Sequence, residues 1–150
     1  MSMILISHRG NIGGRNVSKE NAPEYIQEAL EKGFDVEVDV WYEKGKWSLG
    51  HDNPQHEVNI SFLKDERLWC HAKNIDALEE MLRNDIHCFW HQADNYTLTS
   101  RGHIWTYPGN IGTSNSVIVC RTVSEIEQYA FTNVLGICAD YLLDARELMR

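Results

Sequence analysis

The stretch that decides the fold runs from residue 3 to residue 52. It opens with MILISHRG at residues 3–10, an apolar run that ends in a charged cluster. A loop containing two glycines and a helical pattern follow, and VEVDV at residues 36–40 then reads as a second strand. A strand, a helix and a strand joined by short links form a βαβ unit, whose strands run parallel. The opening third of the chain therefore predicts an α/β protein with a parallel sheet.

The helix of this unit carries signals at both ends. Asn21 can cap its first turn, and Glu24, three residues on, is spaced as the partner in a capping box. Pro23 is tolerated in a first turn, and Gly33 suits the end of the helix. Apolar residues recur at helical spacing along one side, which predicts a face that packs on the sheet.

The rest of the chain alternates short strands and helices. A turn at 44–46 leads to a strand at 47–52, and one helical turn is predicted at 60–63 within an irregular segment. Further strands are predicted at 68–73, 87–91, 103–107, 117–120 and 135–139. Helices are predicted at 75–84, 122–131 and 142–149, the first capped by Asn74 and the second opened by Thr122 with Glu125. The helix at 75–84 is expected to bury Ile75, Leu78, Met81 and Leu82.

Composition limits the classes of protein to consider. With 150 residues and 43% hydrophobic residues, the chain suits a single domain over residues 1–150 with a substantial core. The net charge of −8 argues against a nucleic-acid partner, and no apolar run reaches the length of a membrane span. The four cysteines are widely spaced in apolar segments, and the start lacks the features of a signal peptide. We therefore expect reduced, buried thiols and a cytoplasmic protein.

Two acidic residues of the second strand are candidates for metal ligands. Because residues two apart in a strand point to the same face, Glu37 and Asp39 project together. Adjacent carboxylates repel each other unless a cation or a proton lies between them, and hard cations such as Mg²⁺ prefer such oxygens. His8 and His51 each lie at the carboxyl end of a neighbouring predicted strand, and imidazoles titrate near neutral pH. These two histidines are candidates for a general acid and a general base.

Four blocks in this stretch resemble the signature of the glycerophosphodiester phosphodiesterase family. They are His8-Arg9-Gly10, Glu20-Asn21-Ala22, Glu37-Val38-Asp39-Val40 and Gly50-His51-Asp52. Their order and spacing match the family pattern over about the first third of the chain. The resemblance implies a (β/α)₈ barrel of the TIM type. Because such a barrel typically needs about 250 residues, we expect a contracted form with several helices shortened or missing. An open α/β sheet is the alternative.

The resemblance also implies a reaction, namely metal-dependent hydrolysis of a phosphodiester. Glu37 and Asp39 would bind the divalent ion, with Mg²⁺ or Ca²⁺ expected and Mn²⁺ as a third candidate. His8 and His51 would serve as the acid and the base, in an order that the sequence leaves open. Arg9 suits phosphate oxygens but could also pair with Glu20, and Glu20 and Asp52 are counted as supporting residues.

The fourth predicted strand departs from the family pattern. The family has Glu-x-Lys there, where the acid binds metal and the lysine contacts phosphate. This chain has His71-Ala72-Lys73, so Lys73 keeps the phosphate role and His71 replaces a carboxylate with an imidazole. His71 is a candidate third metal ligand of softer character, and another acid such as Asp94 could assist.

Later positions contribute fewer candidates. Trp105, followed by a threonine, resembles the Trp-Thr pair of the family's seventh strand. It could wall the substrate pocket, although core packing is an equal alternative. Asp140 lies in a block similar to the family's closing motif and could orient a pocket group. His91 ends its strand and could line the mouth of the barrel, whereas His103 begins one and is expected to be structural.

Three functional hypotheses remain open on the sequence alone. The first is hydrolysis of a glycerophosphodiester. The second is hydrolysis of another phosphodiester, such as a lysophospholipid, although the short loops favour a small substrate. The third is a barrel that binds a phosphate ligand without catalysis. Missing helices would expose apolar strand surface, so a homodimer is also a prediction.

Overall fold

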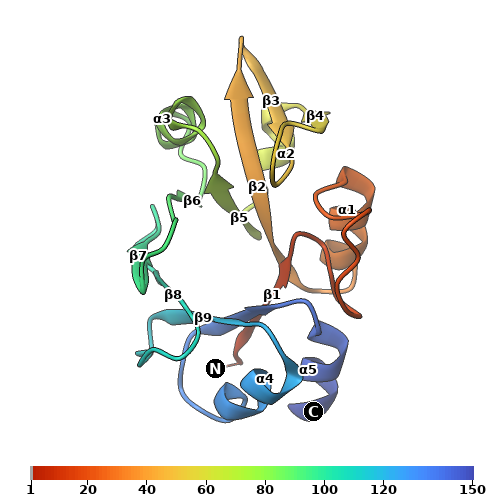
Figure 1. Cartoon of the computed structure of the whole chain (residues 1–150), viewed down its shortest axis with the longest axis vertical. Helices are drawn as coiled ribbons and strands as arrows, with labels where there is room; N and C mark the ends of the chain where they lie inside the picture. Colours follow the sequence, from red (N-terminus) through yellow and green to blue (C-terminus); the bar gives the residue numbers. More distant parts are fainter. Residues whose placement is uncertain (1) are drawn as a thin grey trace.

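The computed structural model describes residues 2–150 and shows an α/β fold built on a mostly parallel sheet (Figure 1). The chain begins with strand β1 (Ile4–His8), helix α1 (Pro23–Glu31) and strand β2 (Asp35–Glu43), as the opening stretch predicts. The later strands are β3 (Lys46–Leu49), β4 (His56–Val58), β5 (Leu68–Ala72), β6 (Cys88–Phe89), β7 (Tyr96–Leu98), β8 (Ile104–Thr106), β9 (Ser116–Cys120) and β10 (Gly136–Ala139). The later helices are α2 (Ile60–Leu63), α3 (Ile75–Arg83), α4 (Val123–Tyr129) and α5 (Leu142–Leu148).

Seven strands of the described chain run parallel, in the spatial order β8-β9-β10-β1-β2-β5-β6. The strands curve into a ring, and β7 lies between the two end strands (Figure 1). β7 pairs antiparallel with β8. Toward β6, the Ser100 amide donates to the carbonyl oxygen of Cys88 at 2.8 Å, and Thr97 Oγ1 donates to that of Trp90 at 2.7 Å. One antiparallel strand thus occupies the place that a βα unit fills in a regular barrel.

Helices cover the outside of the ring. Valines 36, 38 and 40 of β2 pack against α1 and α3 in one apolar cluster, together with Ile26 and Met81. A second cluster joins β9 and β10 to α4 and α5 around Ile118, Ile126 and Ile137. Among the described residues, no helix follows β6 or β8. The fold is therefore the contracted barrel that was predicted, with the missing helices in the second half of the chain.

The interior of the ring has an apolar layer below a polar one. Ile6, Trp69, Phe89, Trp105 and Cys138 form the inner cluster, each at most 3% exposed. Because side chains two apart in a strand share a face, the inward positions above this cluster are His8, His71, His91 and Asp140. These positions lie toward the carboxyl ends of the parallel strands, which is where the active sites of TIM barrels lie.

Several local predictions need correction. Asn21 does not cap α1, since the N-cap is Ala22 and no side chain caps this helix. Ile75 and Leu82 are 68% and 55% exposed, contrary to prediction, whereas Met81 is buried as predicted, together with Ala77. The caps by Asn74 and Thr122 are confirmed, because each side chain accepts a hydrogen bond from the backbone three residues on.

Two further observations concern the whole chain. Within residues 2–150, no helix combines the length and the apolar character that crossing a membrane requires. All four cysteines are free and buried, as expected. Burial raises the pKa of the Cys70 and Cys138 thiols, which keeps them in the neutral form.

Candidate metal centre

Two buried carboxylates form the base of the site. Glu37 and Asp39 project from β2 into the ring, with 3% and 0% of each residue exposed. The register places His8 of β1 beside Glu37, and His71 of β5 beside Asp39. Side chains of paired residues in adjacent strands share a face, so this register brings four titratable groups together. Glu37, Asp39 and His71 each offer a donor atom, and all of these atoms lie within 4.8 Å of one another.

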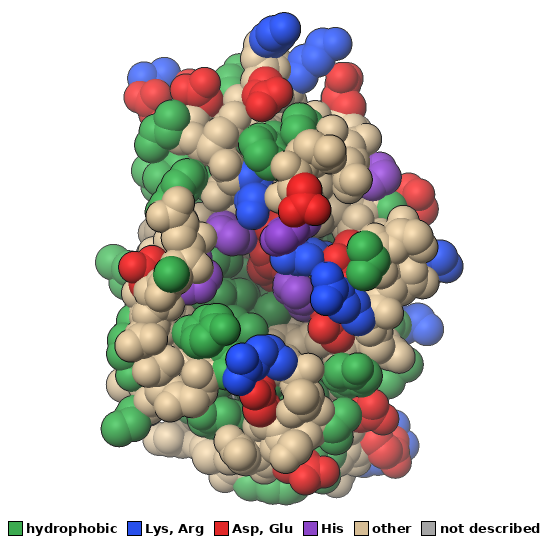
Figure 2. Space-filling model, in the orientation of Figure 1, with side chains coloured by type: hydrophobic (Ala, Val, Ile, Leu, Met, Phe, Trp, Pro, Cys, Tyr) green, Lys and Arg blue, Asp and Glu red, His purple; other side chains and the backbone are tan. Residues whose placement is uncertain are grey.

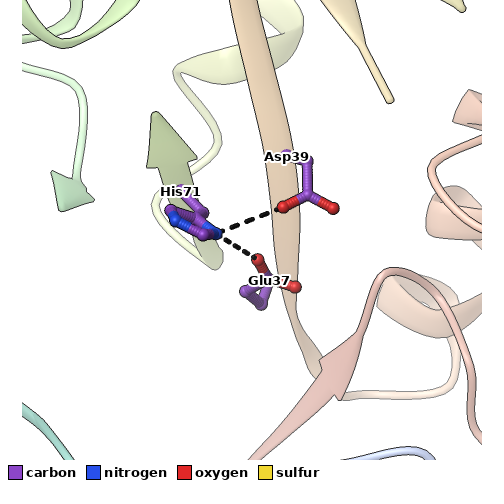
Figure 3. Close-up of side chains that lie close together, drawn as sticks. All are labelled: Glu37, Asp39 and His71. Atoms are coloured by element: carbon purple, nitrogen blue, oxygen red, sulfur yellow. Dashed lines mark ion pairs between the residues drawn. The ribbon is translucent and has the colours of Figure 1, made fainter. Parts of the chain in front are cut away.

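His71 faces both carboxylates (Figure 3). Its Nδ1 lies 3.2 Å from Asp39 Oδ1 and 3.7 Å from Glu37 Oε2. Its Nε2 lies 2.9 Å from the carbonyl oxygen of His91. A carbonyl oxygen only accepts hydrogen bonds, so Nε2 carries a proton and Nδ1 is the nitrogen that is free to meet a cation.

The carboxylates lack protein partners for some of their oxygens. Glu37 Oε1 and Asp39 Oδ1 are buried and accept no hydrogen bond of good geometry from the described residues. Burial, and then the charge of Asp39, raise the pKa of Glu37 to about 7. Burial opposes ionisation of Asp39 as well, but His71 and Arg9 overcome it and lower the pKa of Asp39. Unpaired buried carboxylate oxygens of this kind fit a divalent cation.

A ring of polar side chains holds Asp39 in place. Arg9 Nε forms an ion pair with Asp39 Oδ2 at 3.0 Å, and Arg9 Nη1 donates to Glu20 at 3.1 Å. Asn21 donates from Nδ2 to Asp39 Oδ2 at 2.9 Å, and its Oδ1 accepts from the Asp39 amide at 3.0 Å. Arg9 therefore has the pairing with Glu20 that the sequence suggested, and it also positions a metal-ligand candidate. A contact between Arg9 and phosphate stays a prediction.

His8 is oriented by Asp140. Its Nδ1 lies 2.8 Å from Asp140 Oδ1, so Nδ1 donates and Nε2 is left facing Glu37 Oε1 at 4.0 Å. Burial disfavours the charged imidazole, but Asp140 and Glu37 outweigh it and raise the pKa of His8. Since the side chain is 30% exposed, Nε2 can exchange a proton with a bound molecule. The orienting role expected of Asp140 has this geometric basis.

His51 lies in a loop that is attached to the carboxylate strand. β3 runs antiparallel to β2, and the Gly50 amide donates to the carbonyl oxygen of Asp39 at 3.1 Å. The His51 side chain is 45% exposed, and its Nδ1 lies 2.9 Å from Asp52 Oδ1. Within the described residues, Asp52 is the one acidic side chain in ion-pair contact with His51. His51 is thus at the rim, accessible to solvent, and its catalytic role stays a prediction.

The two remaining substrate-contact candidates differ in depth. Lys73 is half-buried just beyond β5, and its amide donates to the carbonyl oxygen of Val40 at 2.8 Å. Trp105 is 3% exposed and stacks on Phe89 with a centroid distance of 4.6 Å. The core-packing alternative therefore describes Trp105. Lys73 remains a candidate for a phosphate contact.

Three contributors were not identified from the sequence. Asn11 is fully buried and donates to both Glu20 and Asp140, linking the Arg9 side of the site to the His8 side. Phe89 stacks on the ring of His71, with centroids 5.1 Å apart. The His91 carbonyl fixes His71, although the histidine itself was expected only to line the mouth. Local patterns do not reveal such contacts, because each joins elements that are distant in the sequence.

The charged groups gather at the centre of one face. Figure 2 shows histidine, acidic and basic side chains around a hollow in the middle of the molecule. Two cavities, of about 700 and 320 Å³, lie elsewhere, around the start of β1 and the end of α5, and no candidate metal ligand lines them. His103 bonds to Asn115 and lies before β8, so its place is structural, as expected.

The fold resembles known phosphodiesterase structures. A glycerophosphodiester phosphodiesterase from Agrobacterium tumefaciens str. C58 matches 96% of this chain over 98% of its own, with a TM-score of 0.59 and 13% identity. A putative glycerophosphoryl diester phosphodiesterase from Silicibacter pomeroyi DSS-3 matches 99% of this chain over 93% of its own, with a TM-score of 0.58 and 11% identity. No protein-family model matches the chain, and no curated protein matches its sequence. At these identities the similarity establishes the fold.

Proposed function

We propose that the chain is a metal-dependent phosphodiesterase that hydrolyses a small glycerophosphodiester. The observation that carries this proposal is the buried group of Glu37, Asp39 and His71 at the carboxyl ends of the barrel strands. Two of its carboxylate oxygens are buried without a partner. The similarity in fold to two phosphodiesterases supports the reaction class.

The roles of the residues follow from their environment. A divalent ion held by Glu37, Asp39 and His71 would stabilise negative charge on a bound phosphate. Lys73 would add positive charge from the next inward position of the same strand. His8, held by Asp140, would transfer a proton through Nε2 on the buried side. His51, held by Asp52 at the rim, would transfer the second proton.

The ion of this proposal is divalent, and Mg²⁺, Ca²⁺ and Mn²⁺ are the ions to which the sequence points. A small substrate is favoured because the second half of the barrel has short connections in place of helices. Two alternatives have the same fold, namely a phosphodiesterase for a lysophospholipid or another diester and a phosphate-binding barrel without catalysis. A cytoplasmic location and a homodimer stay predictions.

The test is hydrolysis of glycerophosphocholine and bis(p-nitrophenyl) phosphate, with each divalent ion and with EDTA. We expect turnover that requires a metal and falls by roughly 10²–10⁴-fold in His8→Ala. Glu37→Gln should abolish the metal-dependent turnover. The matched controls are His103→Ala and Glu28→Gln, which change a histidine and a glutamate outside the site.

The outcomes separate the three hypotheses. Turnover of the glycerophosphodiester that is lost in both variants supports the proposal. Turnover of only another diester favours the second hypothesis. Binding of inorganic phosphate without turnover of any diester, at any metal, would favour the binding module.

A further inference from the structure

The donor set of the candidate metal centre contains one nitrogen whose direction is fixed. Nε2 of His71 donates to the His91 carbonyl, so the neutral ring presents the Nδ1 lone pair to the two carboxylates. A second-shell bond of this kind sets the tautomer and the orientation of metal-ligating histidines. The ring is therefore oriented so that a cation displacing the Nδ1 proton would meet the nitrogen lone pair between the two carboxylates.

Aromatic packing prevents this ring from turning away. The His71 ring lies almost parallel to that of Phe89, at an interplanar angle of 6° and a centroid distance of 5.1 Å. Phe89 in turn stacks on Trp105 in the apolar layer below. An ion in the site would consequently find the imidazole held in place beside the two carboxylates.

The spacing of the donors accommodates a directly bound ion. Two ligand atoms on an ion with bonds of about 2.0–2.2 Å lie roughly 2.8–3.6 Å apart at ordinary coordination angles. Nδ1 of His71 lies 3.2 Å from Asp39 Oδ1 and 3.7 Å from Glu37 Oε2. The distance to Asp39 lies within this range and the distance to Glu37 just above it, so a small adjustment of Glu37 would let one ion bind all three donors. Several divalent ions have bonds of this length, so the selectivity depends on the chemistry of the donors.

No further acid completes an all-oxygen site among the described residues. Asp94, the acid that could have assisted, has a 61% exposed side chain and pairs only with His91, at 3.9 Å. The group of potential ligands contains two carboxylates and one imidazole. Imidazole suits zinc, copper, iron and nickel, and the affinity of a given site rises along the first-row series from Mn²⁺ toward Cu²⁺. Mg²⁺ and Ca²⁺ are held mainly by oxygen.

We infer that this site takes a divalent transition ion of the cobalt, nickel and zinc class in preference to Mg²⁺ or Ca²⁺, with His71 Nδ1 as a direct ligand. This inference rests on the metal centre of the proposed function and replaces the ions expected from the sequence with another class of divalent ion. It is independent of which phosphodiester is cleaved. His71 is the residue that would select between the two classes of ion, because the two carboxylates would accept either class.

The test measures binding of Co²⁺, Zn²⁺, Mg²⁺ and Ca²⁺ by calorimetry to the wild type, to His71→Glu and to the control His103→Glu. In the wild type we expect Co²⁺ and Zn²⁺ to bind at least roughly 100-fold more tightly than Mg²⁺. In His71→Glu, the ratio of Co²⁺ to Mg²⁺ affinity should fall by roughly 10-fold or more. His103→Glu makes the same chemical change at the other end of the barrel and should leave the ratio unchanged.

A second measurement detects the histidine ligand directly, in the wild type and in His71→Glu. In ¹⁵N-histidine NMR spectra, Zn²⁺ should shift the Nδ1 resonance of one imidazole, and His71→Glu identifies that resonance by its loss. A wild type that binds Mg²⁺ as tightly as Co²⁺, or binds no ion, overturns the inference. So does Zn²⁺ binding that shifts no histidine resonance.

The failure of this inference can be told from failure of the proposed function. Turnover that requires Mg²⁺ and is insensitive to Co²⁺ and Zn²⁺ would support the phosphodiesterase activity and contradict the inferred ion preference. Tight binding of Co²⁺ through His71, without hydrolysis of any diester, would support the ion preference and contradict the proposed activity.

Discussion

At the scale of the residue, the main feature is the cost of placing two carboxylates together in the interior. Glu37 and Asp39 are buried on one face of one strand. The protein compensates Asp39 with Arg9, Asn21 and His71, which hold it ionised, and leaves Glu37 to share its charge with a proton or a cation. Because only Asp39 is held ionised in this way, we expect the stability of the protein to depend on pH.

Without metal, the stability of the protein should fall as pH rises through neutrality. The pKa of Glu37 is raised from 4.5 to about 7, so between these values the folded state holds a proton that the unfolded state has lost. This difference corresponds to up to about 3 kcal/mol of stability lost over that window. His8 and His71 act in the same direction, because their pKa values are raised and their stabilisation disappears at higher pH.

Urea unfolding in EDTA, at about pH 5 and at about pH 8, measures this change. Glu37→Gln should remove much of the decrease, whereas Glu28→Gln, at an exposed position of α1, should keep it. Equal pH dependence in the wild type and in Glu37→Gln would contradict this assignment of charge.

The sequence identified the ionisable residues of the site but not the amides that hold them. Strand periodicity placed Glu37 and Asp39 on one face, His8 was inferred from its place at a strand end, and the resemblance to the family pointed to His71. Asn21 was assigned to a helix cap, since Asn before a helix usually has that role. Its partner Asp39 lies eighteen positions away in sequence, and only the fold brings the two together.

At the scale of the element, the loop after β3 determines where His51 lies. The Gly50 amide bonds to the carbonyl oxygen of Asp39, and a Cβ atom on Gly50 would collide with the backbone carbonyl oxygen of Asn53. The close turn of this loop therefore depends on the absence of a side chain. It fixes the rim histidine relative to the buried carboxylates.

Gly50→Ala should distinguish the proposed acid–base role of His51 from ion binding by the metal-ligand candidates. We expect the loop to shift and kcat/KM to fall by roughly 10²–10⁴-fold, the size of a lost acid–base group. Ion affinity should stay within a few-fold, because the metal-ligand candidates lie on β2 and β5. Steady-state kinetics and calorimetry provide the two readouts.

Gly45→Ala is the matched control for this change. Gly45 also has a positive φ, of 75°, but its Cβ would meet no atom within 4 Å. Gly45→Ala therefore tests the effect of a side chain at a residue with positive φ where no steric collision occurs. Full activity in Gly50→Ala would mean that the placement of His51 is not needed for turnover.

Long elements could be predicted and short polar ones could not. β1, β2, β9 and the capped helices have clear apolar periodicity and appear where the sequence places them. β4 and β7 have three residues each with mixed polarity, and they exist because an adjacent strand offers hydrogen bonds. The buried face of α3 was misassigned because a small residue, Ala77, lies against the sheet where larger apolar residues were expected.

At the scale of the whole molecule, the ring is closed by few bonds. Ser100 joins the two sides, since its Oγ accepts from the Cys88 amide at 2.9 Å and its own amide donates to the Cys88 carbonyl oxygen. The neighbouring parallel strands are held by regular ladders. The junction between β6 and β7 is therefore the weakest part of the closure.

Ser100→Ala should loosen this junction selectively. Loss of the side-chain acceptor leaves the Cys88 amide without its partner, which costs on the order of 1–3 kcal/mol locally. Hydrogen exchange measured by mass spectrometry should accelerate by roughly 10-fold or more in residues 86–91, and it should stay slow in β1 and β2. Ser18→Ala, at an exposed loop position, is the control. Uniform acceleration across the sheet would indicate general destabilisation.

The contraction itself could be predicted from length, but its location could not. A chain of 150 residues cannot hold eight full βα units, so some helices had to be absent. Residues 92–102 looked like a polar connection, and its short antiparallel strand became evident only through the pairing with β8. Which units are lost depends on pairings across the ring that no local pattern encodes.

In the ring, the strands that carry the candidate site residues and the connections that are shortened lie in different arcs. The two carboxylates, His8 and His71 come from β1, β2 and β5, which are consecutive around the circumference. The shortened connections lie in the opposite arc, between β6 and β9. Insertions or deletions in that arc would reshape the surroundings of the candidate metal centre while the donor atoms kept their positions. This arc is therefore where the specificity of such a barrel could diversify in evolution, or be engineered, without rebuilding its centre.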